Sequence, residues 1–122
     1  MSQRVIHEID PETGIVLLEM HRLNGRLHRN SKQGPALIHR HPDTGTVIEE
    51  RYYWNGRLHR EDGAAVLEYN YLNSVPMSEM YYRHGLIHRD PKQGPARLER
   101  NDSGTILLVA GALVAFSLSL MG

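Results

Sequence analysis

The chain has 122 residues, no cysteine, and 14 basic and 14 acidic residues, so its formal net charge is zero. This length accommodates one domain but not an enzyme with separate cofactor and substrate domains. The lack of cysteine excludes disulfides and thiolate metal sites. The zero net charge argues against nucleic acid as a partner.

The charges are distributed unevenly along the chain. All 28 acidic and basic residues lie at or before Asp102, and none follows between Ser103 and Gly122. Residues 105–121 read TILLVAGALVAFSLSLM, with one threonine and two serines as the only polar residues among 17. We therefore expect a polar repeat domain over residues 1–103 and an apolar tail over residues 104–122.

A short motif recurs three times in the polar domain. Asn24–Arg29 reads NGRLHR and is repeated identically at Asn55–Arg60, and an altered copy, HGLIHR, occupies His84–Arg89. A small-residue signal follows each copy, reading GPA at 34–36, GAA at 63–65 and GPA at 94–96. The copies start 31 and 29 residues apart. Repetition at such a period is typical of arrays in which each unit packs on its neighbours.

Turn signals separate the segments of the repeats. In chain order they are PETG at 11–14, NG at 24–25, PDTG at 42–45, NG at 55–56, NS at 73–74 and DSG at 102–104. Asn-Gly suits a type I′ hairpin turn, in which both residues have positive φ. Between turns, Thr46–Trp54 and Ala64–Tyr71 alternate with a period of two, as strands do. The sequence predicts an all-β meander of antiparallel hairpins, with about three repeats and roughly eight short strands.

The string N-G-x-L-H-R-(x)-G-P-A resembles a repeat found in uncharacterised proteins of phages, large DNA viruses and some bacteria. It is also similar, more distantly, to variants of the MORN repeat, which are stacked β-hairpins. The resemblance covers about residues 14–104, and it implies a hairpin-repeat fold without implying an activity. His84 replaces the motif asparagine and Ala64 replaces the motif proline, so we expect looser turns there within the same fold.

Three of the eight histidines occupy equivalent positions in the repeat. His28, His59 and His88 are each followed by arginine. Because a single active site does not recur three times along an array, we expect each imidazole to bond a backbone group of a turn. We expect the arginines to pair with acids such as Glu61 or Asp90. The alternative is a histidine ladder that binds metal or senses pH.

His39 and His41 are spaced as two ligands on one face of a strand, and His7 could approach them from a neighbouring strand. A zinc site needs three or four protein ligands, so we expect no metal. No nucleophile elbow, P-loop or metalloprotease motif is present. The sequence therefore predicts no catalytic residue and no cofactor.

Pairs of aromatic residues precede the second and third motifs. Because adjacent residues of a strand point to opposite faces, only half of these rings can be core. We expect Tyr53 and Tyr82 to face outward and, with Arg51 and Arg83, to contact a protein partner. Stacking on single-stranded nucleic acid is the alternative.

The tail supports two predictions. As a helix, residues 105–121 reach the lower end of membrane-spanning length. Gly111, Ala115 and Ser119 would then form a stripe of small residues that lets helices approach closely, while Leu113 and Phe116 would lie on the remaining surface. As a strand, residues 105–110 would complete a last hairpin. We expect the C-terminal apolar helix to be transmembrane, and the alternative is a buried cap or oligomer interface.

Arg97 and Arg100 precede the tail, and no charge follows it, which favours a cytoplasmic location for the repeat domain. We therefore expect a non-enzymatic accessory or scaffold subunit that is tail-anchored in a membrane protein complex. The alternative is a soluble phage-type or mobile-element protein that binds and inhibits a host protein.

Overall fold

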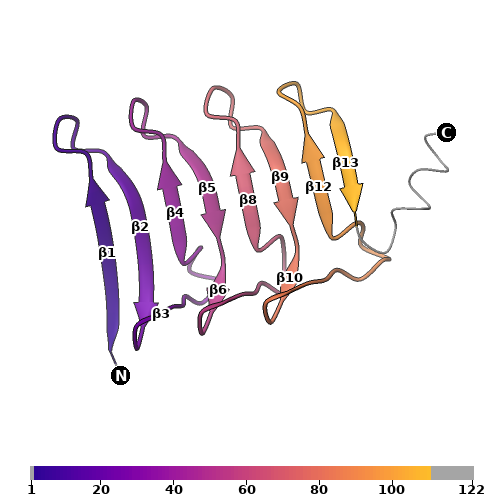
Figure 1. Ribbon diagram of the computed structural model, residues 1–122, viewed down its shortest axis with the longest axis horizontal. Coiled ribbons are helices and arrows are strands. Elements are labelled where there is room, and N and C mark those ends of the chain that lie inside the picture. The colour runs from indigo at the N-terminus through magenta and orange to yellow at the C-terminus, as the bar shows by residue number, and fades with distance from the viewer. Residues whose placement is uncertain (1, 111–122) are drawn as a thin grey trace.

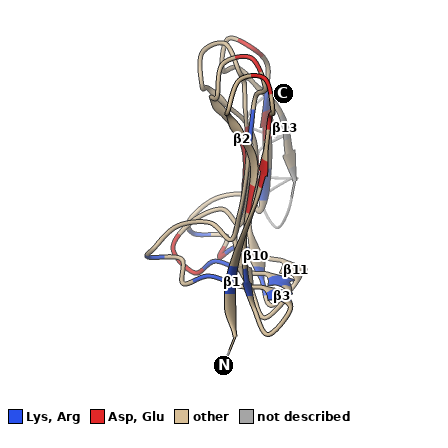
Figure 2. Cartoon of the chain, turned by 90° about the vertical axis from the view of Figure 1, so that its left-hand side faces the viewer, with Lys and Arg blue, Asp and Glu red and all other residues tan. Residues whose placement is uncertain are grey.

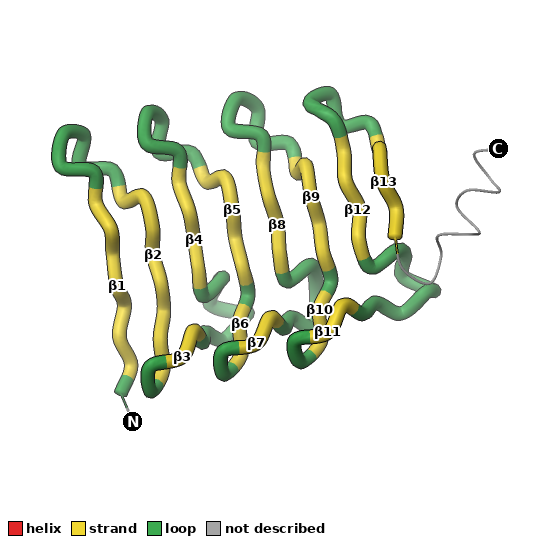
Figure 3. Tube along the Cα trace, in the orientation of Figure 1, coloured by secondary structure: helices red, strands yellow, loops and turns green. Residues whose placement is uncertain are grey.

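The computed structural model describes residues 2–110, which form strands connected by turns and loops (Figures 1 and 3). The strands are β1 (Gln3–Ile9), β2 (Val16–Leu23), β3 (Arg26–Leu27), β4 (Leu37–Arg40), β5 (Val47–Arg51), β6 (Tyr53–Trp54), β7 (Arg57–Leu58), β8 (Val66–Tyr69), β9 (Pro76–Met80), β10 (Tyr82–Arg83), β11 (Leu86–Ile87), β12 (Arg97–Arg100) and β13 (Ile106–Ala110).

Eight of these strands lie side by side in one sheet, in the order β1-β2-β4-β5-β8-β9-β12-β13, and all neighbours are antiparallel. β3 pairs with β2, and two further small sheets are the hairpins β6-β7 and β10-β11. The prediction of an all-β antiparallel meander is confirmed. The short strands belong to the recurring motif, which leaves the end of one long strand and returns to start the next.

The motif hairpins stack on one another along the lower edge of the sheet in Figure 1. The amide N of Gly56 donates to the carbonyl O of Leu27, and the amide N of Gly85 donates to that of Leu58, both at 2.8 Å. Each hairpin thus extends a ladder begun by the preceding hairpin. This bonding explains why the motif must recur at a nearly fixed spacing.

The sheet is a single layer in its upper part and thickens only where the motif hairpins and loops flank it (Figure 2). The buried hydrophobic residues among those described are Ala36, Ile38, Tyr52, Ala64, Ala65, Val66 and Ala96. Most of them lie at the lower end of the long strands. With so small a core, hydrogen bonds and stacked side chains between repeats carry much of the ordering.

The turns have the dihedrals that their residues predict. Asn55 and Gly56 have φ of 48° and 80°, as in a type I′ turn. His84 and Gly85 have nearly the same values, 51° and 82°. The replacement of asparagine by His84 therefore leaves the turn conformation unchanged.

Replacing Gly56 by valine should lower the free energy of unfolding by ~1 kcal/mol or more, because positive φ is costly for a β-branched residue. A Cβ at Gly56 would lie 3.7 Å from the side chain of Arg26, an ordinary van der Waals contact, so the cost comes from the backbone conformation. Chemical denaturation measures the effect. The control is Asn55→Gly, which permits both positive φ angles and should change stability much less. Equal stability of Gly56→Val and the parent chain would contradict the turn assignment.

The tail departs from its prediction at its beginning. Ile106–Ala110 form β13, which pairs with β12, so the expected helix does not start at Thr105. The strand alternative is correct for these residues because the turn at 102–104 returns the chain alongside β12. The rest of the predicted helix lies outside the described residues. Within residues 2–110 we find no helix that could cross a membrane.

Candidate functional site

The arginine that ends each motif folds back over the sheet. The guanidinium carbon of Arg60 lies 3.9 Å from the centroid of the Tyr52 ring, and that of Arg89 lies 3.9 Å from the Tyr81 ring. Nη1 of the three equivalent arginines donates to a backbone carbonyl: Arg29 to Pro35 at 3.2 Å, Arg60 to Ala64 at 3.1 Å and Arg89 to Pro95 at 3.1 Å. These stacks cover the small residues of each repeat.

We expected these arginines to pair with acids such as Glu61 or Asp90. Two of them do pair with acids, but with others: Arg60 lies 3.5 Å from Asp62, and Arg29 lies 3.9 Å from Glu19. The guanidinium groups of Arg60 and Arg89 also lie over aromatic rings, and all three arginines donate to backbone carbonyls. Neighbouring positions in the sequence do not reveal these contacts. Their role is to hold the loop against the sheet.

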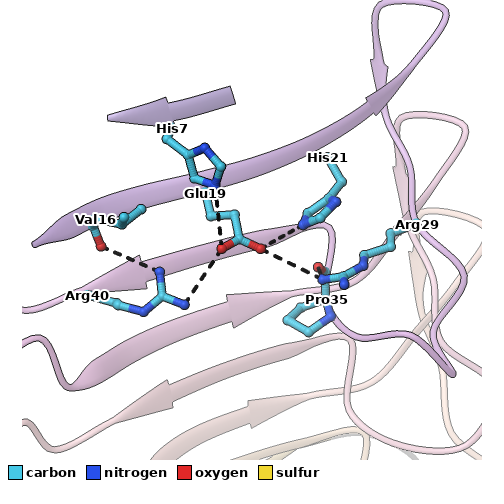
Figure 4. A network of polar contacts seen from close by, with 7 residues as sticks. All are labelled: His7, Val16, Glu19, His21, Arg29, Pro35 and Arg40. Atoms are coloured by element: carbon cyan, nitrogen blue, oxygen red, sulfur yellow. Dashed lines mark hydrogen bonds and ion pairs between the residues drawn. The ribbon is translucent and has the colours of Figure 1, made fainter. Parts of the chain in front are cut away.

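Glu19 on β2 is surrounded by basic side chains from β1, β2, β4 and the first motif loop (Figure 4). Its Oε2 lies 2.7 Å from Nε2 of His21, and its carboxylate oxygens lie 3.7–3.9 Å from His7, Arg29 and Arg40. The hydrogen bond to His21 is the main cause that lowers the pKa of Glu19 below its usual value, against an opposing effect of burial. The ionised carboxylate therefore stabilises the fold at neutral pH, and this contribution is lost as the pH falls through the lowered pKa.

The equivalent carboxylates in the next two repeats keep the position but change the partner. Glu50 accepts a hydrogen bond from the hydroxyl of Tyr69 at 2.5 Å, and Glu79 pairs with Arg100. Burial and the bond to Glu50 raise the pKa of Tyr69. All three glutamates are thus engaged in joining neighbouring strands, which is a structural use of these acids.

Two motif histidines cap the turn of the following repeat, as predicted. Nδ1 of His28 accepts a hydrogen bond from the amide N of Asn55, and Nδ1 of His59 accepts one from the amide N of His84, both at 3.0 Å. The ring of His28 also lies against Trp54, and that of His59 against His84. His88 belongs to the last motif, which no further motif hairpin follows in residues 2–110.

We expect His59→Ala to lower the thermal midpoint measurably, because it leaves the amide of His84 without its acceptor. His88→Ala is the matched control, since no such cap exists for it in the described structure, and it should have a smaller effect. Thermal unfolding monitored by circular dichroism compares the two variants. Equal losses would contradict the capping role.

Stability should also fall between about pH 7.5 and about pH 5.5. Burial, with smaller effects of His84 and Arg83, lowers the pKa of His59 below 6.5, and the 3.8 Å contact to Glu61 opposes this. The unfolded chain therefore takes up the proton first, so the contribution of His59 is lost as the pH falls. Denaturation at both pH values should show a smaller drop for His59→Ala. An unchanged drop would exclude His59 as a source.

The three histidines considered as zinc ligands, His7, His39 and His41, do not lie together as a ligand set. His7 and His39 occupy adjacent rows of the sheet and therefore point to opposite faces. His41 stacks on Tyr71, and its Nδ1 accepts from the amide of Asp43. Within the described residues, no three His, Cys, Asp or Glu side chains are grouped as metal ligands.

The predicted partner-binding residues lie in two successive repeats. Tyr53 and Tyr82 are half-buried on β6 and β10. The backbone carbonyl of Tyr53 accepts from the amide of Arg29, and that of Tyr82 accepts from the amide of Arg60. Arg51 is paired with Glu49 at 2.9 Å, whereas Arg83 is exposed and donates to the carbonyl of Glu61. The predicted tail residues Gly111, Leu113, Ala115, Phe116 and Ser119 lie outside the described residues.

Open grooves separate successive motif loops at one end of the sheet. One groove runs between the first two loops and includes Lys32, Trp54 and His59 in its lining. The next includes Tyr81, Arg83 and Arg89. Exposed side chains at this end, rather than an enclosed cavity, are what a partner would meet.

This end is also the basic end of the molecule, which sequence reasoning missed. We call residues 2–5, 21–36, 52–65 and 81–96 the lower end, and residues 6–20, 37–51, 66–80 and 97–110 the upper end. The lower end holds ten basic and three acidic residues, a formal charge of +7, and the upper end holds four basic and eleven acidic residues, a formal charge of −7. The basic residues are Arg4, Arg22, Arg26, Arg29, Lys32, Arg57, Arg60, Arg83, Arg89 and Lys92.

The neutral total thus conceals two ends of opposite sign, as Figure 2 shows by colour. The signal was available in the sequence, because the segments around the motifs hold ten of the 14 basic residues and the segments around the other turns hold eleven of the 14 acids. Only the meander brings like segments to the same end. Comparisons of the chain with protein-family models, with curated proteins and with solved structures gave no match.

Proposed function

We propose that this protein is a non-enzymatic accessory or scaffold subunit of a membrane protein complex. Its uncharged C-terminal segment attaches it to the membrane, and its sheet covers a cytoplasmic surface of the complex. The observation that carries the proposal is the course of β13. This uncharged edge strand runs toward the basic lower end (Figure 1). Residues 111–122, which follow it in the sequence, carry no charge either.

The exposure of β13 supports the proposal. Ile106 and Leu107 are 44% and 66% exposed although they are large apolar residues. The opposite edge strand, β1, carries Arg4 and Glu8, charges of the kind that discourage strands from adding to an edge. The C-terminal edge lacks such protection and suits a surface that a partner covers.

The form of the sheet agrees with a binding role. Its upper part is one layer thick, so both faces meet solvent along several repeats. Flat repeat arrays commonly bind extended protein surfaces. The residues we propose to contact the partner are Tyr53, Tyr82, Arg51 and Arg83, which lie in two successive repeats.

A second candidate is a soluble protein that binds and inhibits a host protein, with residues 104–122 as a cap or an oligomer interface. The observation in its favour is that β13 takes Ile106–Ala110 into the sheet and leaves an open apolar edge. The resemblance of the motif to repeats of phage proteins supports it by analogy alone.

Purification of the tagged full chain in mild detergent, followed by identification of the proteins that accompany it, tests the proposal. Subunits of a membrane assembly are the expected result. A soluble host protein, retained equally well without detergent, would contradict the proposal and favour the second candidate.

A further inference from the structure

We propose that the last motif hairpin, β10-β11, docks a β-hairpin of a partner protein whose two-residue turn presents two successive backbone amides. The partner hairpin continues the stack that the motif hairpins form (Figure 3). This inference rests on the proposed role as a scaffold for protein partners, and it adds the surface and the kind of element bound there. We call Ile87, His88 and Arg89 the open end of the stack.

The two junctions between successive motif hairpins use the same set of hydrogen bonds. In each junction a leucine, a histidine and an arginine of the earlier hairpin offer a carbonyl O, an imidazole Nδ1 and an amide N–H. The later hairpin supplies the amides of its two turn residues and a tyrosine carbonyl. The bonds are Gly56 N to Leu27 O (2.8 Å), Asn55 N to His28 Nδ1 (3.0 Å) and Arg29 N to Tyr53 O (3.2 Å), and then Gly85 N to Leu58 O (2.8 Å), His84 N to His59 Nδ1 (3.0 Å) and Arg60 N to Tyr82 O (3.2 Å).

The open end carries the same groups in the same order. Ile87 has the carbonyl, His88 the imidazole and Arg89 the amide, and within residues 2–110 none of them makes the bond that its counterparts make. Ile87 is 51% exposed and His88 is exposed, whereas their counterparts in the first two motifs are half-buried. Unpaired backbone groups at the end of an array are a template for one more hairpin.

The side chains of the last hairpin also suit a protein partner. Leu86 is 72% exposed at the position where the first two motifs have Arg26 and Arg57. Leu86, Ile87 and His88 line one shallow groove together with Arg83 and His84. A hairpin placed on this groove removes the two aliphatic side chains from water, which adds an apolar contribution to the hydrogen bonds.

The course of the chain argues against two other occupants. The second and third motif hairpins follow β5 and β9, so a fourth hairpin of the array would follow β13. Residues 111–122 contain neither Asn-Gly nor the His-Gly variant and therefore lack the motif turn. The motif hairpins of a second copy each follow a long strand, which would overlap β13. A partner hairpin without such a strand avoids this overlap.

A cyclic peptide with the sequence of residues 52–59 tests the proposal, because this segment makes the bonds of the first junction. Cyclisation is needed because an isolated hairpin is marginally stable. The peptide is titrated into the isotope-labelled full chain in mild detergent and followed by NMR. We expect the amide signal of Arg89 to shift, whereas the amides of Arg29 and Arg60, which are bonded inside the stack, should shift little.

Matched changes test the individual bonds. In the peptide, N-methylglycine in place of Gly56 removes the amide donor and keeps the backbone of glycine, and affinity should fall by up to about tenfold. In the chain, His88→Ala removes the acceptor of the open end and should weaken binding to a similar extent. His28→Ala is the control, because it removes the same acceptor at an internal junction, and it should leave the affinity unchanged. Circular dichroism confirms that both variants fold.

The other outcomes overturn docking of a partner hairpin. Absence of binding to the full chain and to a chain that ends after Ala110 would show that the open end accepts no hairpin. Binding to the truncated chain alone would show that residues 111–122 cover the open end. A shift of Arg89 on concentrating the chain without peptide would assign the open end to a second copy. Membrane attachment is measured separately by fractionation, so docking can fail while attachment stands.

Discussion

Replacing Ala65 by leucine is expected to lower the free energy of unfolding by ~3 kcal/mol, at the upper end of what overpacking usually costs. Ala65 is fully buried at 0% exposure. Its amide donates to the carbonyl of Met80, and its carbonyl accepts from the amide of Tyr52, so both neighbouring strands fix its position. A larger side chain therefore cannot be accommodated by a shift of the backbone at this position.

The space beside Ala65 is closed by the repeat itself. Continuing the register places Ala65 between Tyr52 and Tyr81, on the face that the arginines cover. Arg60 stacks on the Tyr52 ring and bonds the carbonyl of Ala64. Leucine would therefore separate a ring from its guanidinium or displace the loop. This arrangement explains why each repeat has alanine at this position, at residues 36, 65 and 96.

Urea denaturation measures the effect, and Gln33→Leu serves as the control. Gln33 is exposed in the first motif loop, so a leucine there should change stability by less than about 0.5 kcal/mol. Similar changes in the free energy of unfolding for Ala65→Leu and Gln33→Leu would show that the stacked arginines can move aside and that the position does not require a small residue.

The repeat and its turns could be predicted because their signals are local. Asn55-Gly56 needs only two positive φ angles, and the structure has them. The capping role of His28 and His59 could also be predicted, because equivalent positions in an array repeat equivalent contacts. Local chemistry and repetition together were sufficient for the antiparallel meander up to the end of β12 at Arg100.

What could not be predicted depends on contacts between distant segments. Thr105–Ala110 has the composition of a buried helix as well as of a strand, and pairing with β12 decides in favour of the strand. Arg60 and Arg89 precede acids in the sequence, yet their guanidinium groups lie over the rings of Tyr52 and Tyr81. All three motif arginines also donate to backbone carbonyls that only the folded sheet brings near. The separation of charge into two ends was hidden in a total of zero, because composition carries no information about the meander.

Leu113→Arg is expected to move the full chain from the membrane fraction to the soluble fraction. A charged residue near the centre of a spanning helix costs ~2.5–3.5 kcal/mol on insertion scales, which is roughly a hundredfold or more in partition. Leu113→Val, which keeps the position apolar, is the matched control and should remain with the membrane. Gly111→Leu should also remain there, but it should weaken association with partner subunits because a bulky residue keeps helices apart.

Fractionation of the three variants should be compared with that of a chain that ends after Ala110, because this truncation keeps β13 and so every described strand. The truncated chain should appear in the soluble fraction like Leu113→Arg, whereas the full chain should resist a salt wash. If the full chain, the truncated chain and Leu113→Arg are all soluble and monodisperse without detergent, the segment does not insert into lipid. The open edge of β13, with exposed Ile106 and Leu107, then becomes the surface that the C-terminal segment or a second copy covers.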